Sequence, residues 1–374
     1  MKQENYRKAV ALRHELHQHP ELSNEETWTK QRLMDFLKEQ TDLEVVDKGN
    51  WFYAVYRAGN DRLNIAFRTD FDALPMDEAI ELPWASKIPG KAHKCGHDGH
   101  AATMIGFALE VDQEGAANNI FFLFQPAEET GDGAIQCVDL IEDEQIDEIY
   151  GYHNFSGLPH QAIAAREGTT HFASKGMTIH FEGTPAHASQ PEDGQNPALA
   201  IAKVVQALPG FTELKEYTGE VLATVIQIAL GSEAFGVSPG EGDLKLTIRA
   251  YAEKDLDRLQ ANVETFAKEL ASQEQLQVAF TYQDEFPETF NHKENVEKVH
   301  QAAESLGYEY TELEKAYRGS EDFGHYTKRI KGAFFYIGNG EEYPQIHTSA
   351  YDYRDENILR GVEMFKALAN MTDQ

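Results

Sequence analysis

The chain concentrates metal-binding and proton-transferring side chains in two short stretches. Residues 95–100 read Cys-Gly-His-Asp-Gly-His and bring together a thiol, two imidazoles and a carboxylate. The second stretch ends a very apolar run and contains the adjacent carboxylates Glu128 and Glu129. Thiolate, imidazole and carboxylate are the donors of zinc-type centres, and a further carboxylate can serve as a base. The two stretches therefore predict a metal-dependent hydrolase.

The Glu128–Glu129 pair can divide two tasks between its members. Adjacent residues that leave a strand point to opposite sides, so one can bind metal while the other faces the attacking water. A carboxylate base beside a metal ion supplies what amide hydrolysis needs. A Glu-Glu pair elsewhere is usually a solvated acidic turn. Its position directly after the run Phe121–Pro126 favours the functional interpretation.

Short apolar strands alternate with helical patterns over the first part of the chain. This order predicts an α/β fold with a mixed, largely parallel sheet and helices on both faces. Asp70 and Asp72, the Glu pair and His153 each follow such a strand. They should meet at the sheet edge where open α/β folds bind ligands. The spacing of Ser23 and Glu26 predicts a capping box that starts the second helix.

The pattern changes after about residue 175. A strand, a helix, two strands, a helix and a strand follow in order, which is the ferredoxin-like βαββαβ plan. We therefore expect two domains. The catalytic, metal-binding domain should comprise residues 1–174 and 285–374, and an inserted lid or dimerisation domain should comprise residues 175–284.

Composition restricts the partners. The chain has 374 residues, 41% hydrophobic and 11% aromatic, which is enough for two cores. Its 63 acidic and 33 basic residues give a formal charge of −30 and argue against nucleic acid and anionic membranes as partners. The two cysteines, the polar start and the lack of long apolar runs lead us to expect a cytoplasmic protein.

The motifs, taken in order, resemble those of one metallo-amidohydrolase family. It includes aminoacylases, hippurate hydrolases, indoleacetyl-amino-acid hydrolases and N-acetyldiaminopimelate deacetylases. The similar stretches cover nearly the whole chain and are residues 13–21, 68–75, 94–100, 124–129, 185–189 and 319–323, with His347 after them.

The resemblance implies a role for each candidate residue. Two divalent ions (Zn, Mn, Co or Ni) would be held by Cys95 as a bridge and by His97, Glu129, His153 and His347. Glu128 would be the general base, and Asp72 would orient a ligand. His187 would stabilise the oxyanion. Arg249, Asn154 and Ser320 would bind the substrate, with the Arg249 fork suited to a carboxylate.

The expected reaction is removal of the acyl group from an N-acyl amino acid or short peptide, by a homodimer built through the inserted domains. One alternative is a metallo-exopeptidase that acts on dipeptides with a free α-amine. Another is a catalytically silent metal- or ligand-binding protein on the same scaffold. The residues do not name the acyl group, the amino acid or the native metal.

Overall fold

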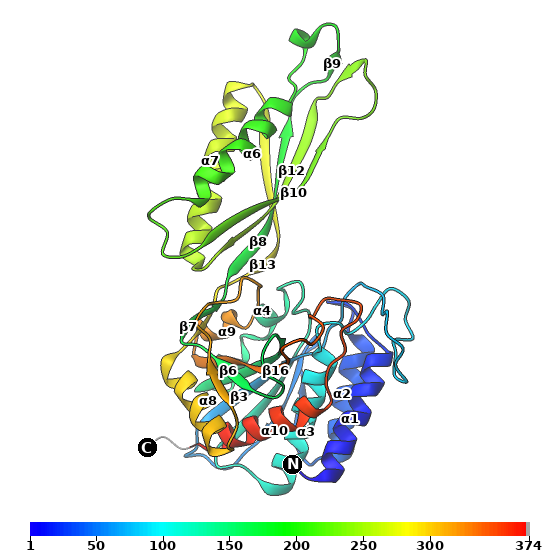
Figure 1. The fold of residues 1–374 in the computed structure, drawn as a ribbon, viewed down its shortest axis with the longest axis vertical. Helices are drawn as coiled ribbons and strands as arrows, with labels where there is room; N and C mark the ends of the chain where they lie inside the picture. The colour runs from blue at the N-terminus through cyan, green and yellow to red at the C-terminus, as the bar shows by residue number, and fades with distance from the viewer. Residues whose placement is uncertain (372–374) are drawn as a thin grey trace. The chain divides into compact units, whose positions relative to one another are not determined.

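The computed structural model describes residues 1–371, which form two compact units (Figure 1). Unit 1 comprises Met1–Thr170, Thr289–Lys315 and the chain from Asp322 onward. Unit 2 comprises His171–Glu288 and Ala316–Glu321. Each unit has its own apolar core. Within residues 1–371, no helix has the length and apolar character that crossing a bilayer requires.

Unit 1 is built on an eight-stranded sheet in the order β1-β2-β4-β3-β5-β16-β6-β15. The central strands β4, β3, β5 and β16 are parallel, whereas β1, β2 and β6 add antiparallel neighbours. This arrangement confirms the predicted α/β class. The strands are β1 (Glu44–Asp47), β2 (Phe52–Tyr56), β3 (Asn64–Asp70), β4 (Asn119–Gln125), β5 (Glu148–Ser156), β6 (Ile163–Ala165), β15 (Tyr310–Glu312) and β16 (Lys331–Gly340).

Helices cover both faces of this sheet. Phe122 and Phe124 of β4 pack in the core under the larger helices, and Phe121 and Leu123 pack on the opposite face. Burial on both faces explains why β4 is a continuous apolar run. The larger helices are α1 (Gln3–Gln18), α2 (Thr27–Gln40), α3 (His97–Glu114), α8 (Lys293–Ser305) and α10 (Glu356–Ala369), and the opposite face carries the short α4 (Gly133–Cys137), α5 (Leu140–Asp143) and α9 (Gly324–Thr327).

The predicted capping box at Ser23 and Glu26 is wrong. Helix α2 begins at Thr27 and has no side-chain cap from Glu26. Glu21 accepts the N–H groups of Trp28 and Thr29. Ser23 donates to Asp72 at 2.7 Å, so the tertiary fold redirects the side chain that the local pattern assigned to the helix.

Unit 2 has the predicted ferredoxin-like order. Its antiparallel sheet is arranged β10-β12-β8-β13, and α6 and α7 pack against it (Figure 1). Beyond one end of the sheet, β9 pairs with β11. The bounds are β8 (Ala173–Glu182), β9 (Ala186–His187), η1 (Pro191–Asp193), α6 (Ala198–Thr212), β10 (Val221–Leu230), β11 (Val237–Ser238), β12 (Glu241–Ala250), α7 (Glu253–Gln273) and β13 (Gln277–Phe286). A separate ribbon pairs β7 (Gly168–His171) with β14 (Thr289–Asn291).

Candidate metal centre and substrate groups

The carboxyl ends of β3, β4 and β5 bring the candidate residues of unit 1 to one edge of the sheet. Asp70 of β3 is level with Gln125 of β4, just before the Glu pair. His153 lies near the end of β5, and α3 begins at His97. Parallel strands that end at the same level place these side chains together, as ligand sites in open α/β sheets require.

A tight turn carries Cys95 and His97 into the site. Gly96 between them has φ 102°, in the left-handed region. A Cβ atom at Gly96 would lie 2.3 Å from Asn154 Oδ1 and 3.0 Å from the Tyr351 hydroxyl. Only glycine satisfies both the conformation and the space, so it lets the thiol and the imidazole on either side of it converge.

Cys95 lies at the centre of the cluster. Its Sγ is 3.3 Å from His153 Nε2 and 3.2 Å from His347 Nε2. Glu129 Oε2 lies 3.4 Å from the same His347 nitrogen. Cys95, His97 and His153 form one group whose donor atoms all lie within 4.8 Å of one another, and Cys95, Glu129 and His347 form a second. Cys95 is shared by these two groups, and His97 and Glu129 belong together to a third group with Glu128.

Two buried donor atoms support the presence of a cation. His97 Nε2 and Glu129 Oε1 lie 3.8 Å apart. Neither has a hydrogen-bond partner among the described residues. This separation is too long for a hydrogen bond, but two donors about 2.1 Å from one zinc-like ion stand about 3.4 Å apart in tetrahedral geometry. An ion would satisfy both atoms, so the donor set fits a divalent metal.

The pKa shifts of His97 and Cys95 also favour a cation at this cluster. Burial lowers the pKa of His97, but the charges of Asp70, Asp72 and Glu129 outweigh it and raise the pKa to about 10. Burial, followed by the charges of Glu129 and Glu128, raises the pKa of the Cys95 thiol well above its usual value. The acidic surroundings hold protons on these donors. A divalent cation would replace those protons, and metal binding should therefore release them.

His187 is exposed on β9 of unit 2. The Ser189 N–H donates to His187 Nδ1 at 3.1 Å, and the Ser189 hydroxyl lies 2.7 Å from the same nitrogen. Because a backbone N–H can only donate, Nδ1 is the acceptor and the ring proton lies on Nε2. The exposed edge of the ring thus presents an N–H donor.

Arg249 and Ser320, the predicted substrate groups of unit 2, lie together. Arg249 donates to the Ser320 hydroxyl at 2.7 Å and to the Arg318 carbonyl at 3.1 Å, and Ser320 contacts Ser174 at 2.6 Å. Burial lowers the pKa of Arg249 because it disfavours the charged form. Among the described residues no carboxylate pairs with this guanidinium. A substrate carboxylate would compensate the buried charge.

His187 and Arg249 lie at opposite ends of the unit 2 sheet. Arg249 is opposite Ser174, whereas Glu241 is opposite Glu182 at the far end of the same strand pair. These two register positions are about 26 Å apart at ~3.3 Å per residue. His187 follows Glu182 in the chain and lies beyond that end. A dipeptide-sized substrate spans only about 7 Å, much less than this separation.

Comparison with known proteins identifies the family. The model of Peptidase family M20/M25/M40 matches residues 66–371. The chain belongs to this family. It is therefore a hydrolase that acts on amide bonds, as the sequence predicted. The family match confirms the resemblance that the motifs showed. It does not name the acyl group or the amino acid of the substrate.

Curated relatives match this M20 hydrolase over nearly its whole length. An N-acetylcysteine deacetylase from Bacillus subtilis is 28% identical over 366 residues, covering 96% of this chain and 95% of the relative. An N-acetyldiaminopimelate deacetylase from Listeria monocytogenes is 30% identical over 362 residues, covering 95% and 96%.

Solved structures share the fold. A protein from methicillin-resistant Staphylococcus aureus aligns with a TM-score of 0.88 at 25% identity, covering 97% of this chain and 96% of that chain. A dinuclear metal-binding peptidase of the M20 family from Bacillus subtilis aligns with a TM-score of 0.83 at 25% identity, covering 98% of both chains.

Asp72 contacts two of the proposed metal-binding residues of this M20 hydrolase, His97 and Glu129. It accepts from Ser23, lies 2.9 Å from His97 Nδ1 and accepts from the Glu129 backbone N–H at 3.0 Å. With Nδ1 held by Asp72, the ring turns Nε2 toward the cluster. Such a partner fixes both the tautomer and the direction of a metal-binding imidazole.

Asn154, which the resemblance assigned to the substrate, is fully buried. Its amide donates to the Cys95 carbonyl at 3.1 Å and to the Tyr351 hydroxyl at 2.8 Å, and its Oδ1 lies 2.7 Å from His100 Nε2. These contacts use the side chain inside the protein. We therefore reassign Asn154, as a proposal, to holding the Cys95 turn.

Sequence reasoning gave no individual role to several buried residues behind the cluster. His100 Nδ1 lies 2.7 Å from Asp70, which also accepts from Arg68. Asp98 forms an ion pair with Arg13, whose Nε lies 2.8 Å from Asp98 Oδ2, and it lies 2.8 Å from His17 Nδ1, tying the start of α3 to α1. The i,i+4 spacing of Arg13 and His17 is a signal for a shared helix face. Their partners lie too far along the chain for any local pattern to show.

Proposed function

We propose that this chain hydrolyses the amide bond of a small N-acyl amino acid at a centre of two divalent ions. Cys95, His97, Glu129, His153 and His347 would hold the ions. The observation that carries the proposal is the convergence of these donors, with His97 Nε2 and Glu129 Oε1 buried and lacking partners among the described residues. When bound, such ions polarise an amide carbonyl and activate water. Their donors suit Zn, Mn, Co or Ni.

Glu128 is the proposed base. Its carboxylate is buried, and Oε2 lies 3.8 Å from His97 Nε2, beside the donor cluster. In this role it takes a proton from the attacking water and delivers it to the leaving amine. Glu129, its neighbour, has one oxygen within reach of His347 and one near His97. The pair thereby separates proton transfer from metal binding.

Arg249 is the proposed partner of the substrate carboxylate. Its guanidinium lacks a carboxylate partner among the described residues, and Ser320 orients it. Arginine pairs with a carboxylate through two parallel hydrogen bonds, which fixes the orientation of the amino acid. An acetylated amino acid is the substrate class named for the deacetylase relatives, and we extend it to this chain.

His187 would donate Nε2–H to the oxyanion of the tetrahedral intermediate, from a second copy of the chain. Its distance from Arg249 within unit 2 supports this division. The edge strand β10 supports a homodimer, because Ile226 and Ile228 are exposed there and edge strands pair readily. The homodimer and the cytoplasmic location stay predictions.

A hydrolysis screen tests the function. Purified protein is supplied with Zn, Mn, Co or Ni in turn and given N-acetyl-, N-benzoyl- and N-succinyl-amino acids beside unblocked dipeptides. We expect turnover of the N-acyl amino acids, with N-acetyl compounds preferred. Faster turnover of the dipeptides would reassign the chain as an exopeptidase. No turnover of any compound with any metal would contradict the proposed function.

A further inference from the structure

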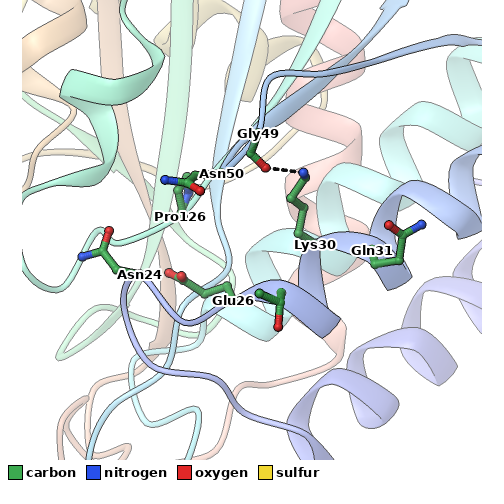
Figure 2. Close-up of a pocket in the computed structure, with 8 residues that line it drawn as sticks. Asn24, Glu26, Lys30, Gln31, Gly49, Asn50 and Pro126 are labelled. Carbon is green, nitrogen blue, oxygen red and sulfur yellow. Dashed lines mark hydrogen bonds between the residues drawn. The ribbon is translucent and has the colours of Figure 1, made fainter.

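A buried carboxyl group lies behind the loop that carries Glu128. Glu26 is 6% exposed, and its Oε1 accepts a hydrogen bond of 2.8 Å from the Ala127 backbone N–H. The same side chain lines a pocket of about 190 Å³ with Asn24, Lys30, Asn50 and Pro126 (Figure 2). Glu26 is thus buried on the loop side and reaches water through this pocket.

The backbone N–H groups on both sides of Glu128 are held by carboxyl groups. Glu26 accepts from Ala127, and Asp72 accepts from Glu129 at 3.0 Å. Ala127 has φ 51°, a left-handed conformation that alanine rarely adopts. Such a residue persists when its surroundings over-determine it. These two hydrogen bonds anchor the loop on either side of Glu128, beside the turn bond from the Gly131 N–H to the Glu128 carbonyl.

We propose that Glu26 is a positioning residue that acts through the Ala127 amide to hold the base Glu128 in its working orientation. The proposal rests on the proposed function, in which Glu128 moves the proton. Asp72 cannot substitute for Glu26, because its oxygens are engaged by His97, Ser23 and the Glu129 amide.

The surroundings of Glu26 indicate that it acts as a neutral acid. Burial, followed by the charge of Asp72 and a smaller contribution from Glu21, raises its pKa to about 8 against the opposing effect of the Ala127 N–H. Lys30 lines the same pocket, but its ammonium bonds to Asp47. It also bonds to the Gly49 carbonyl, as Figure 2 shows. A neutral carboxyl has the shape of a glutamine amide, so glutamine should replace Glu26 and alanine should not.

Kinetics of the metal-loaded variants give the main test. Glu26→Ala should lower kcat about tenfold to a hundredfold, the scale of a misplaced catalytic group, with KM and metal content nearly unchanged. Glu26→Gln should retain kcat within about threefold, because it keeps the acceptor for Ala127. Glu26→Asp keeps a carboxyl but withdraws it, and should resemble alanine. Equal kcat in the glutamine and aspartate variants would overturn the proposal, as would normal kcat in Glu26→Ala.

The matched control is Glu25→Gln, whose carboxylate is exposed and pairs with Lys91. It should leave kcat, KM and loop protection unchanged. A loss equal to that of Glu26→Ala would overturn the proposal, since the effect would then belong to the segment and not to the Ala127 contact.

Amide hydrogen exchange tests the contact without substrate or metal. The peptide that contains Ala127 should exchange faster in Glu26→Ala than in the wild type, and Glu26→Gln should restore protection. Unchanged exchange would overturn the proposal even in an active enzyme. If the wild type hydrolysed nothing in the screen, the proposed function would fail, while this measurement would still decide whether Glu26 holds the loop.

Stability against pH reports the charge state. The folded pKa of Glu26 is raised from 4.5 to about 8, so its stabilising contribution is full below 4.5 and is lost as the pH rises through 8. The melting temperature of the wild type should therefore fall relative to Glu26→Gln across that window. A constant difference between pH 4 and pH 9 would contradict the neutral acid.

Discussion

In unit 1 the proposed metal donors are buried or nearly so except His347, whose side chain is 49% exposed, whereas in unit 2 His187 is exposed and Arg249 is partly buried. Asp72 holds His97 and the Glu129 amide, and the Asn154 side chain holds the Cys95 carbonyl. The His153 ring bonds to the Asn154 carbonyl, and the His347 amide donates to the Lys94 carbonyl. Among the described residues, the His187 ring hydrogen-bonds only with Ser189.

The difference corresponds to two proposed roles, metal binding in unit 1 and substrate binding in unit 2. A dinuclear centre needs donors fixed to within a fraction of an ångström, and a buried hydrogen-bonded shell provides this. The proposed substrate groups of unit 2 must instead stay accessible to a ligand. The comparison therefore predicts that changes in unit 1 alter metal content or chemistry. Changes in unit 2 should alter turnover or substrate affinity while the metals stay.

The largest effect should come from removing the metal. We expect chelation to abolish hydrolysis and a loaded chain to contain about two divalent ions.

Cys95 should resist alkylation in the loaded protein and react after chelation, because the freed thiol loses its ligand bond. Mass spectrometry of the labelled peptides measures this, with buried Cys137 as the internal control. Equal labelling in both states would remove Cys95 from the donor set.

Substitution of the base should come next. Glu128→Gln keeps the size of the side chain but cannot accept a proton, so kcat should fall about a hundredfold or more. Elemental analysis should find its metal content unchanged. Glu129→Gln is the matched variant and should lose metal. If Glu128→Gln kept its activity, the proton acceptor would have to be sought elsewhere.

His187→Ala should lower kcat about a hundredfold, the scale for losing one oxyanion donor, while metals and fold are retained. Mixing this variant with Glu128→Gln should restore part of the activity, because one hybrid site then contains an intact base and an intact His187. Light scattering that finds only monomers at working concentrations would exclude the cross-subunit version. Unchanged turnover in His187→Ala would remove the residue from the mechanism.

The smallest effect should be that of Arg249. Arg249→Lys keeps the charge but loses the planar fork, so KM should rise about tenfold while kcat changes little. The matched control is a substrate whose carboxylate is replaced by an amide, for which variant and wild type should have similar KM. An equal loss on both substrates would show that Arg249 does not contact the carboxylate.

Sequence reasoning worked best where a local pattern is compatible with only one arrangement of helices and strands. The ferredoxin-like order of unit 2 followed from strand and helix periodicity, because its helices are amphipathic and its sheet buries one face. The same reasoning failed at Ser23 and Glu26. Their spacing fits a capping box, yet Ser23 bonds to Asp72 and Glu26 to Ala127. A side chain in a short motif can bond instead to a residue far along the chain, and the local sequence does not reveal that partner.

The order and type of the donor residues along the chain were enough to predict an amide hydrolase of this family and to propose its metal ligands and base. Which groups lie close enough to act together follows from the fold. It buried Asn154 behind the Cys95 turn and placed Glu26 behind the base loop. It also put His187 and Arg249 at opposite ends of one sheet. The physical reason is that these relations arise from strand register and from hydrogen bonds between residues far apart in the chain, which the fold brings together.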